Sequence, residues 1–413
     1  MKPIVIVGAG LAGLTCARQL QESGIPFKIF EAGDDVGGRV RTDDVDGFLL
    51  DRGFQVMLSA YPACQRWLDT AALDLRAFEP GAAIRIRQGW QRVVDPRRGI
   101  GDLWASLQAD IGSFGDKLRV LKWALSSRHD PDSFGPTGTD KSSLVHLEAK
   151  GFSDDMINTF WRPWLSGIFL ESDLQTSHLM LEFVFSMFAR GETVVPRDGM
   201  QAIPRQLAAA LPDESITLNQ RVRRVEASGI ELPDGSRIDA TAVVLAVDGD
   251  AATTLGFGVP DLGWREARCL YFAAPRAPTP DGLLRLNGET DGVINHLVTL
   301  SQVNRNCAPE GQELVMVGIR PGTGGENQVI ERQATAQLEV WFGPQVKRWR
   351  VLRHDVVKQA LPTRGSLKAL AGETTTGGLF QCGDYLRHPS IQGAMESGEF
   401  VAKQITDRFQ RSV

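Results

Sequence analysis

The chain has 413 residues, of which 42% are hydrophobic and 23% charged, values that are ordinary for a soluble globular protein. Its formal net charge of −5 gives no electrostatic reason to expect a nucleic acid partner. The five cysteines form no CxxC pair and no metal-ligand spacing, so the sequence predicts no metal site. Because the length exceeds one typical hydrophobic core, we expect two domains.

Targeting features are absent from the pattern. No apolar run reaches the ~18 residues that cross a bilayer, and the richest stretch, residues 179–188, is interrupted by Glu182. The first expected strand begins at Pro3, which leaves no room for a signal peptide, and an odd number of cysteines suits a reducing compartment. We therefore expect a cytoplasmic protein. A peripheral contact with a membrane surface stays open.

The first thirty-one residues carry the clearest motif. Residues 3–7, PIVIV, are typical of a buried parallel strand, and the GxGxxG loop at 8–13 opens a predicted helix that continues over 14–23. A second apolar run at 27–30 stops at Glu31. Strand, glycine loop, helix, strand and acid together form a complete βαβ dinucleotide fingerprint. The alternative is a glycine-rich turn in a plain α/β fold.

Each part of this fingerprint has a physical role. Gly8 permits a tight turn, Gly10 lets the backbone approach a pyrophosphate, and Gly13 lets helix and strand pack closely. The helix N-terminus presents free N–H groups to phosphates, and Glu31 can accept hydrogen bonds from ribose hydroxyls. The residues expected to contact the dinucleotide here are Gly8, Ala9, Gly10, Leu11, Ala12, Gly13, Glu31 and Ala32.

Two further motifs identify a family resemblance. Gly37-Gly38-Arg39 is followed by Thr42 and then by residues 51–55, DRGFQ. With the fingerprint, these motifs resemble the FAD-binding superfamily of flavin amine oxidases, protoporphyrinogen oxidases and phytoene-desaturase-like enzymes, the last branch being nearest. The resemblance implies that Arg39 lies along the FAD pyrophosphate, a role suited to a planar guanidinium. It also places Gly38 at the cofactor and Gly53, Phe54 and Gln55 near the isoalloxazine.

The middle of the chain is less specific. Residues 82–87 and 91–95 alternate around Gln88-Gly89, which predicts a hairpin. Helices are expected near 101–110, 115–126 and 143–150, and the Pro- and Gly-rich residues 129–142 predict an exposed loop.

Residues 160–170, FWRPWLSGIFL, resemble a segment of the substrate domain in phytoene-desaturase-like and carotenoid-isomerase-like proteins. One interpretation is a core helix whose Arg162 makes an internal ion pair. The other is a wall of a long apolar substrate tunnel formed by Trp161, Trp164 and Phe169, with Arg162 near its mouth. The sequence leaves both interpretations open.

The resemblance also predicts the domain organisation. It implies an α/β (α+β) fold with a Rossmann-like FAD-binding domain made of residues 1–72, 192–258 and 352–413. A discontinuous substrate-binding domain of mixed sheet and helices would comprise 73–191 and 259–351. In the family, a strand near residues 221–226 contacts the adenine through backbone groups, which matches Val222.

The last part of the chain, residues 379–400, resembles the closing motif of the family. The resemblance implies that Gly383 and Asp384 bind the ribityl-phosphate region. A helix N-terminus would face the flavin pyrimidine ring and favour negative charge on the reduced cofactor. Its residues are Ile391, Gln392, Gly393 and Ala394. Because Cys382 precedes Gly383 on the strand, the tethering cysteine of covalent members has no counterpart, and we expect non-covalent FAD.

The flavin itself would carry the hydride chemistry, so no protein acid or base is required and the catalytic residues stay unknown. His388 follows Asp384 by four residues, and is either near the flavin or a loop histidine bonded to backbone. The other five histidines carry no spacing signal and are interpreted as structural: His129, His146, His178, His296 and His354.

Three activities compete. The first is a dehydrogenase, desaturase or oxidase that passes a hydride from an isoprenoid, carotenoid or tetrapyrrole to flavin N5, with a quinone or O2 as acceptor. The second is a redox-neutral polyene isomerase that uses reduced FAD. The third is an amine or amino-acid oxidase. Ala273 and Ser390 stand at the positions where, by the resemblance, amine oxidases have a lysine and an aromatic ring. Without that ring, recognition of a substrate amine loses its cation–π contribution. A flavin-binding protein without turnover is the remaining alternative.

Overall fold

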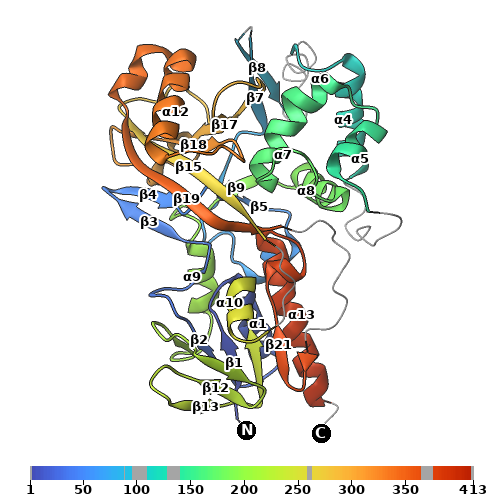
Figure 1. Cartoon of the computed structure of the whole chain (residues 1–413), viewed down its shortest axis with the longest axis vertical. Coiled ribbons are helices and arrows are strands. Elements are labelled where there is room, and N and C mark those ends of the chain that lie inside the picture. Colours follow the sequence, from blue (N-terminus) through green and yellow to red (C-terminus); the bar gives the residue numbers. More distant parts are fainter. Residues whose placement is uncertain are drawn as a thin grey trace.

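The computed structural model describes residues 2–87, 89–94, 109–127, 140–257, 263–363 and 375–410. The molecule is elongated, and both chain termini lie at the same end (Figure 1). That end holds a six-stranded sheet with helices α1 and α13. The other end holds a seven-stranded sheet that is flanked by helices (Figure 1).

The six-stranded sheet has the strand order β10-β2-β1-β14-β21-β20. Its central strand β1 pairs in parallel with β2 on one side and β14 on the other, and every residue of β1 and β14 is buried. Parallel strands buried on both faces explain the continuous apolar runs in the sequence. The strands are Ile4–Val7 (β1), Phe27–Phe30 (β2), Ile216–Thr217 (β10), Ala242–Leu245 (β14), Thr375–Thr376 (β20) and Leu379–Gln381 (β21).

Helices from the two ends of the chain pack together against this sheet. Helix α1, Leu11–Glu22, lies beside helix α13, Ile391–Gln410 (Figure 1). A Cβ atom on Gly398 of α13 would lie 2.2 Å from the Ala12 carbonyl oxygen, so only glycine permits this approach. The close packing brings Ala12 and Gly398, which are 386 positions apart (398 − 12), into one layer.

The seven-stranded sheet has the order β19-β15-β18-β17-β16-β7-β8. It is antiparallel except for the parallel pair β16 and β7. Helix α12, Asn327–Phe342, covers one face with Ile330, Ala334 and Leu338. The strands are Gly81–Ile86 (β7), Gly89–Val94 (β8), Trp264–Ala274 (β15), Leu284–Asn287 (β16), Ile294–Thr299 (β17), Glu313–Ile319 (β18) and Arg350–Pro362 (β19).

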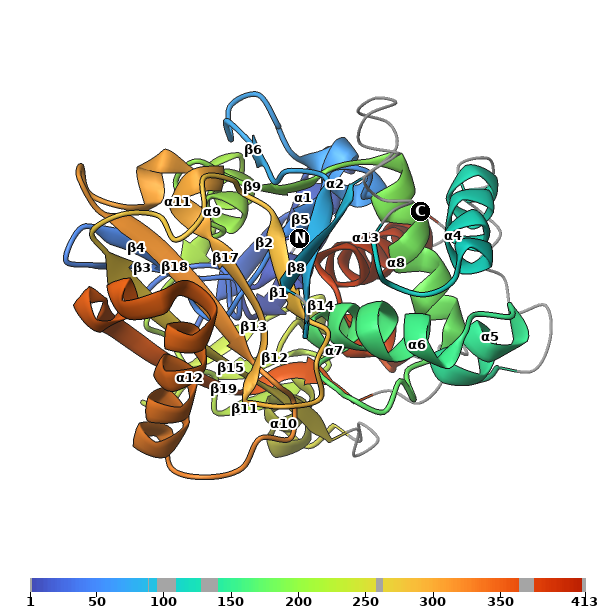
Figure 2. The ribbon, with the colours of Figure 1, turned by 90° about the horizontal axis from the view of Figure 1, so that it is seen from above.

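A group of helices covers the other face of that sheet, on the side opposite α12 (Figure 2). Its centre is the aromatic segment, where a π-helical turn, η2 (Ile157–Trp161), runs into α7 (Arg162–Phe169). Pro163 has no N–H to donate to the turn before it, which accounts for the widened helix. The other members are Phe114–Ser126 (α4), Ser143–Ala149 (α5), Asp154–Met156 (α6) and His178–Arg190 (α8).

Smaller elements join the two ends of the molecule. The hairpin of Thr42–Val45 (β3) and Phe48–Asp51 (β4) leads toward the site, and Met57–Leu58 (β5) and Arg76–Ala77 (β6) pair with Thr193–Val195 (β9). The remaining elements are Pro62–Trp67 (α2), Ala202–Ala209 (α9), Arg224–Glu226 (β11), Gly229–Glu231 (β12), Arg237–Asp239 (β13), Gly249–Thr254 (α10), Leu300–Val303 (α11), and the 3₁₀ turns Arg305–Cys307 (η3), Gly343–Arg348 (η4) and Asp384–Leu386 (η5).

Most expected elements are confirmed. The hairpin predicted from residue 82 is β7 and β8, and the helices predicted at 115–126 and 143–150 are α4 and α5. Most of the helix expected near 101–110 and of the loop expected at 129–142 lies outside the described residues. The domain boundary expected at residue 352 falls inside β19, which pairs with β15 over most of its length. The domain division therefore stays a prediction.

In the part of the chain that the structure describes, no helix combines the length and the apolar composition required to span a bilayer.

Candidate functional site

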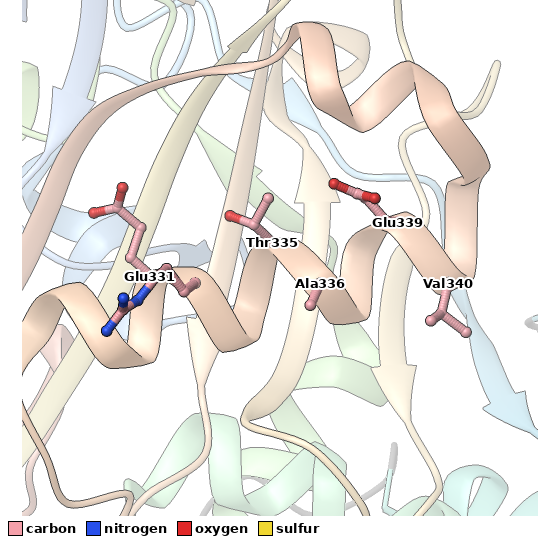
Figure 3. Close-up of a pocket in the computed structure, with 6 residues that line it drawn as sticks. Glu331, Thr335, Ala336, Glu339 and Val340 are labelled. Atoms are coloured by element: carbon pink, nitrogen blue, oxygen red, sulfur yellow. The ribbon is translucent and has the colours of Figure 1, made fainter.

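One depression on the described surface is a shallow one along α12 (Figure 3). Its lining includes Glu331, Thr335 and Glu339, which lie on the outer side of the helix, while Ala334 and Leu338 face the sheet. It holds no convergent group of polar side chains beside an apolar wall, which is the usual form of a ligand site. The residues that the sequence singled out gather elsewhere, where the two ends of the chain meet.

The N-terminus of α1 forms a cradle walled by glycine. Gly10 caps the helix without a side chain, and the first turn has no acidic residue, so its N–H groups and dipole face outward uncompensated. A Cβ atom on Gly10 would meet no heavy atom within 4 Å, and one on Gly38 would lie 3.5 Å from the Gly10 Cα. A Cβ atom on Gly13 would lie 2.1 Å from the Gly8 carbonyl oxygen. The cradle is therefore open to a ligand at Gly10 and closely packed between Gly8 and Gly13.

Glu31 lies at the carboxyl end of β2, beside this cradle. Its two carboxylate oxygens accept hydrogen bonds from the backbone N–H groups of Ala9 and Gly33, each at 2.7 Å. These bonds hold the carboxylate against the glycine loop and leave lone pairs for a hydroxyl donor. Ala32 follows in the same turn. The predicted bond to a ribose stays a prediction.

Arg39 and Asp384 were predicted separately from the two ends of the sequence, and the structure pairs them. Nη2 of Arg39 lies 2.5 Å from Oδ1 of Asp384, and Nη1 donates to the Ala360 carbonyl oxygen at 2.9 Å. The Asp384 side chain is only 5% exposed, whereas that of Arg39 keeps 37% of its surface. The guanidinium also lies over the Trp264 ring, 5.6 Å from its centroid. A charged group that is fixed by a buried partner and still accessible is suited to bind an anionic ligand.

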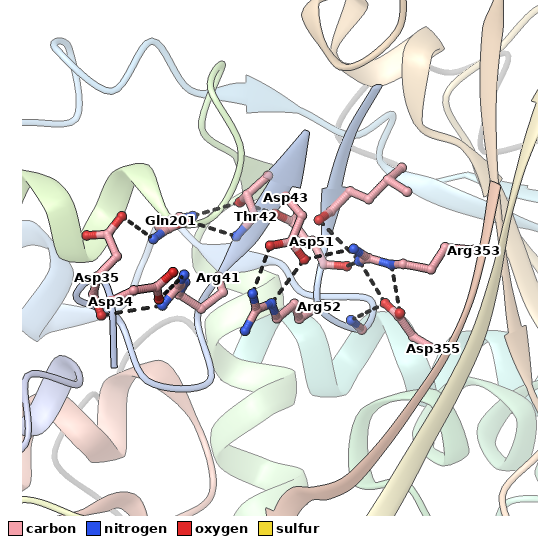
Figure 4. A network of polar contacts seen from close by, with 12 residues as sticks. Asp34, Asp35, Arg41, Thr42, Asp43, Asp51, Arg52, Gln201, Arg353 and Asp355 are labelled. Atoms are coloured by element: carbon pink, nitrogen blue, oxygen red, sulfur yellow. Dashed lines mark hydrogen bonds and ion pairs between the residues drawn. The ribbon is translucent and has the colours of Figure 1, made fainter. Parts of the chain in front are cut away.

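The Gly53-Phe54-Gln55 segment is held by a polar network (Figure 4). Nη2 of Arg353 donates to the Asp51 carbonyl oxygen at 2.8 Å, and Arg353 also pairs with Asp355. Asp355 in turn accepts from the Gly53 N–H at 3.3 Å. The segment is therefore fixed by side chains of β19, which belongs to the other sheet.

Gln55 joins this segment to the Arg39 loop. Its side-chain amide donates to the carbonyl oxygens of Arg39, at 2.9 Å, and Arg52, at 3.0 Å. Gln55 therefore has a positioning role in the protein. Phe54 points toward the seven-stranded sheet. Its ring lies 5.4 Å from that of His296 on β17 and 6.2 Å from that of Phe78, which follows β6.

The start of α13 is capped by the residue before it. The Ser390 hydroxyl accepts from the Gly393 N–H at 3.0 Å, and the Ser390 carbonyl accepts from Ala394 at 3.0 Å. The side chain of Gln392 is buried and accepts from the Ala63 N–H at 2.9 Å, which ties the helix to α2. Ser390, which stands where an aromatic ring was expected in amine oxidases, is thus used for capping.

His388 is held by side chains near this helix start. Its Nδ1 lies 2.9 Å from the Ser390 hydroxyl and its Nε2 3.4 Å from the Glu396 carboxylate, while its ring contacts Phe183 of α8 at 4.7 Å. Burial acts to raise the pKa of Glu396, but the hydrogen bond and charge of His388 outweigh it and the net shift is downward. The ring partners are therefore side chains, whereas one of the two expectations was a loop histidine bonded to backbone. Its proximity to a flavin stays a prediction.

Val222 precedes β11, close to the Glu31 turn. Its side chain is buried in the small core around β1 and β14. Within the described ranges, neither its N–H nor its carbonyl oxygen has a hydrogen-bonding partner, although neighbouring Gln220 and Arg223 donate to Glu31 and Glu231. Backbone donor and acceptor groups at this place, without a partner among the described residues, fit the adenine contact implied by the resemblance.

The aromatic segment divides into buried and accessible members. Trp161 is fully buried among rings that include Trp123, Phe152 and Phe185, whereas Trp164 is half-buried. Phe169, at the end of α7, lines a small cavity with Met180, Arg265 and Pro389, beside the start of α13. These positions favour a core role for Trp161 and keep Phe169 as a candidate wall residue.

The internal ion pair expected for Arg162 is wrong. Arg162 donates to the Asn158 side-chain oxygen at 3.1 Å and to the Ser172 carbonyl oxygen. Among the described residues no carboxylate forms an ion pair with it. The guanidinium therefore braces the end of α7 through neutral acceptors, and its proposed place at a tunnel mouth stays untested.

Sequence reasoning missed three residues that contribute to the site region. Arg353 and Asp355 hold the 51–55 segment from β19, and His296 contacts Phe54 from β17. The alternation of Arg353 and Asp355 on one strand face was a usable signal. A lone histidine on a buried strand gave none.

A Rossmann-like sheet that is closed by helices from both chain ends, with a glycine cradle and an accessible arginine paired to a buried carboxylate, is typical of a dinucleotide-binding protein. Comparison with known proteins agrees with this class. The family model of flavin containing amine oxidoreductase matches residues 11–406. The chain belongs to this family of oxidoreductases, as the motifs predicted.

The relatives that match this chain are named for different substrates. A hydroxysqualene dehydroxylase of Sinorhizobium fredii is 38% identical over 384 residues, which cover 81% of this chain and 87% of that protein. A 15-cis-phytoene desaturase of Arabidopsis thaliana is 40% identical over 466 residues, which cover 98% of this chain and 80% of that protein. Two porphyrinogen oxidases match 40% of this chain, and the match spans only 31% and 32% of their lengths.

The fold is shared with solved structures. A putative protoporphyrinogen oxidase from Exiguobacterium has a TM-score of 0.74 at 18% identity, covering 98% of this chain and 99% of that one. The α/β class with a Rossmann-like part and a mixed second sheet is therefore confirmed.

Proposed function

We propose that the protein is an oxidoreductase with non-covalently bound FAD that removes a hydride from an apolar small molecule, such as an isoprenoid, a carotenoid or a tetrapyrrole. The observation that carries the proposal is the Arg39–Asp384 pair. It lies where the open glycine cradle of α1, the 53–55 segment and the start of α13 converge. These groups come from distant parts of the chain and share one ligand only if that ligand is as long as a dinucleotide.

The residues present fit FAD. The cradle at Gly10 and Gly38 would take the pyrophosphate with Arg39, Glu31 would take the adenosine ribose, and Val222 would take the adenine through its unpaired backbone groups. The uncapped helix start at α1 supports the negative charge of the phosphates. When bound, the flavin would accept the hydride. The protein would orient the two reactants and exclude water.

Cysteine placement supports non-covalent binding. All five cysteines are free and buried, and burial raises the pKa of the Cys382 thiol to about 12. A protonated thiol inside the six-stranded sheet is a poor nucleophile toward a flavin ring.

The substrate side supports an apolar ligand rather than an amine. Ala273 is buried on β15, where the resemblance to amine oxidases would require a lysine, and Ser390 caps α13 instead of contributing a ring. The small cavity beside the start of α13 is lined mainly by apolar residues, with Thr176, Ser177 and Arg265 as its polar members; the apolar ones are Phe169, Met180, Leu361, Pro362 and Pro389. Hydroxysqualene dehydroxylase and phytoene desaturase are named for isoprenoid chemistry, which agrees with this lining. A quinone or O2 would take the electrons.

Flavin binding is tested with two glycine-to-alanine variants, one in the proposed cradle and one outside it. Neither Gly10 nor Gly324 would place a Cβ atom within 4 Å of another group, so G10A and G324A should both fold. We expect G10A and R39A to lose FAD, measured as the ratio of 450 nm to 280 nm absorbance, and G324A to keep it. Acid precipitation of the wild type should release all of its flavin. A wild-type protein that takes up no FAD would overturn the proposal.

The substrate class is tested by anaerobic bleaching of the flavin. Phytoene and coproporphyrinogen III are mixed separately with the oxidised holoenzyme, and putrescine serves as the amine. Bleaching by phytoene or by coproporphyrinogen III, followed by recovery with a quinone or O2, supports the proposal. Bleaching by putrescine alone would contradict it.

A further inference from the structure

His296 lies on the face of the seven-stranded sheet that is turned away from α12. Its neighbours Ile294 and Leu297 belong to the core under α12, whereas Val298 belongs to the main core with the aromatic helices. The imidazole contacts the ring of Phe54, with centroids 5.4 Å apart. His296 is therefore placed between the 53–55 segment and the aromatic segment.

Two glycines make room for this ring. A Cβ atom on Gly318 of β18 would lie 2.2 Å from the imidazole, and one on Gly167 of α7 would lie 3.1 Å from it. Any other residue at Gly318 would displace the histidine. The sequence thus accommodates a flat side chain here at the expense of packing on two neighbouring elements.

The protonation of the ring follows from its neighbour Asn295. The Asn295 amide nitrogen donates to the Pro163 carbonyl oxygen at 3.0 Å, which assigns the orientation of the amide. The same nitrogen lies 3.0 Å from Nδ1 of His296. Because an amide nitrogen can only donate, Nδ1 accepts, and a neutral imidazole then carries its proton on Nε2. Burial lowers the pKa of His296 to about 4, so the ring is neutral at pH 7.

Among the described residues, the Nε2–H group has no hydrogen-bond partner. His296 is 7% exposed. A buried donor without an acceptor is costly, whereas an apolar side chain of similar shape would avoid the cost. The unpaired group therefore points to an acceptor that arrives with a ligand.

We propose that His296 is a specificity residue of the substrate site, whose Nε2–H donates a hydrogen bond to one oxygen atom of an otherwise apolar substrate. This inference rests on the proposed function, because it requires an apolar ligand beside Phe54. The expected ligand class is an isoprenoid that carries a hydroxyl or carbonyl group, as opposed to a pure hydrocarbon. His296 orients the ligand and takes no part in hydride transfer.

The test uses a matched pair of probes, squalene and hydroxysqualene, which differ in one hydroxyl group. Each is titrated in detergent into the FAD-bound protein, and binding is followed by the flavin difference spectrum. We expect the wild type to bind hydroxysqualene about tenfold more tightly. H296L should lose that preference and keep its affinity for squalene, and H296Q, which retains an N–H donor, should recover part of it.

Several results would overturn the inference. Equal affinities of the wild type for the two probes would do so, as would an equal loss for both probes in H296L, which indicates packing. Flavin content and thermal midpoint are measured for each variant, and H296M replaces H296L if that variant does not fold. A wild type that binds FAD but shows no response to either probe refutes this inference alone. A wild type that binds no FAD refutes the proposed function itself.

Discussion

The buried carboxyl group of Asp51 gives a prediction whose size follows from the structure. One of its oxygens accepts from the Thr42 hydroxyl at 2.5 Å and from the Met200 N–H at 3.0 Å. Burial nevertheless raises the pKa of Asp51 from 3.8 to about 6, because desolvation of the charge outweighs these hydrogen bonds. Asparagine has the same shape and keeps an acceptor oxygen for both donors. Asp51→Asn should therefore remove the charge without breaking the contacts.

The sign and size follow from linkage between protonation and folding. Since the folded pKa lies above the unfolded value, the favourable contribution of Asp51 is complete below pH 3.8 and is lost as the pH rises through about 6. The difference between the two pKa values corresponds to about 3 kcal/mol in the free energy of unfolding. This is an upper limit, because Asp51 keeps some accessible surface. D51N should therefore be more stable than the wild type above pH 7, by about 3 °C in thermal midpoint for a chain of this size.

The assay is a thermal scan of the flavin-free protein and of D51N between pH 4.5 and 8. The difference between the two midpoints should be small at pH 4.5 and grow with pH. Asp43→Asn is the matched control of opposite sign, because hydrogen bonds and charge from Arg52 and Arg353 lower the pKa of Asp43. D43N should be less stable than the wild type at neutral pH, and because its stabilising charge is lost only below pH 3.8, that difference should stay nearly constant between pH 4.5 and 8. A pH-independent difference for D51N would refute the reasoning.

Three further predictions concern packing and reactivity. Gly398→Ala places a Cβ atom 2.2 Å from the Ala12 carbonyl oxygen, so it should lower both the thermal midpoint and the flavin content, measured on the same sample. Trp161→Ala opens a cavity among aromatic rings and should cost about 3–5 kcal/mol in urea unfolding, whereas W161F should cost less. The five buried cysteines should not react with Ellman's reagent at pH 8 until denaturant is added, and early reaction of any one would contradict its burial.

The sequence predicted the parts of the fold that local pattern determines. The apolar runs at 3–7 and 27–30 became β1 and β2 because a strand buried on both faces needs an apolar side chain at every position. The glycine loop predicted the start of α1 because no other residue combines its turn with its close packing. The resemblance placed Arg39 and Asp384 at the same cofactor, but their pairing was seen only in the structure, since nothing in either segment encodes contact with the other.

The remaining features depend on contacts between distant residues. The parallel pairing of β16 with β7 joins strands about 200 residues apart, and neither strand carries a mark of its partner. The role of His296 required three facts that only a structure supplies: the orientation of Asn295, the two glycines beside the ring, and the absence of an acceptor among the described residues. For Arg162, one of the two interpretations was an internal ion pair, whereas its acceptor in the structure is a carbonyl oxygen just beyond the end of a helix.

The 51–55 segment is held on one side by Thr42 of β3 and by Met200 before α9, and on the other side by the seven-stranded sheet, which links the places of cofactor and substrate. The Asp51 carboxyl group is bound by Thr42 and Met200, next to the six-stranded sheet, while its carbonyl oxygen accepts from the Tyr271 hydroxyl and from Arg353, both at 2.8 Å, on the seven-stranded sheet. A ligand that shifted the seven-stranded sheet would therefore move the backbone beside Phe54. The same backbone is expected to border the flavin. A substrate held by the seven-stranded sheet is then positioned relative to the cofactor through residues 51–55, which are hydrogen-bonded on both sides.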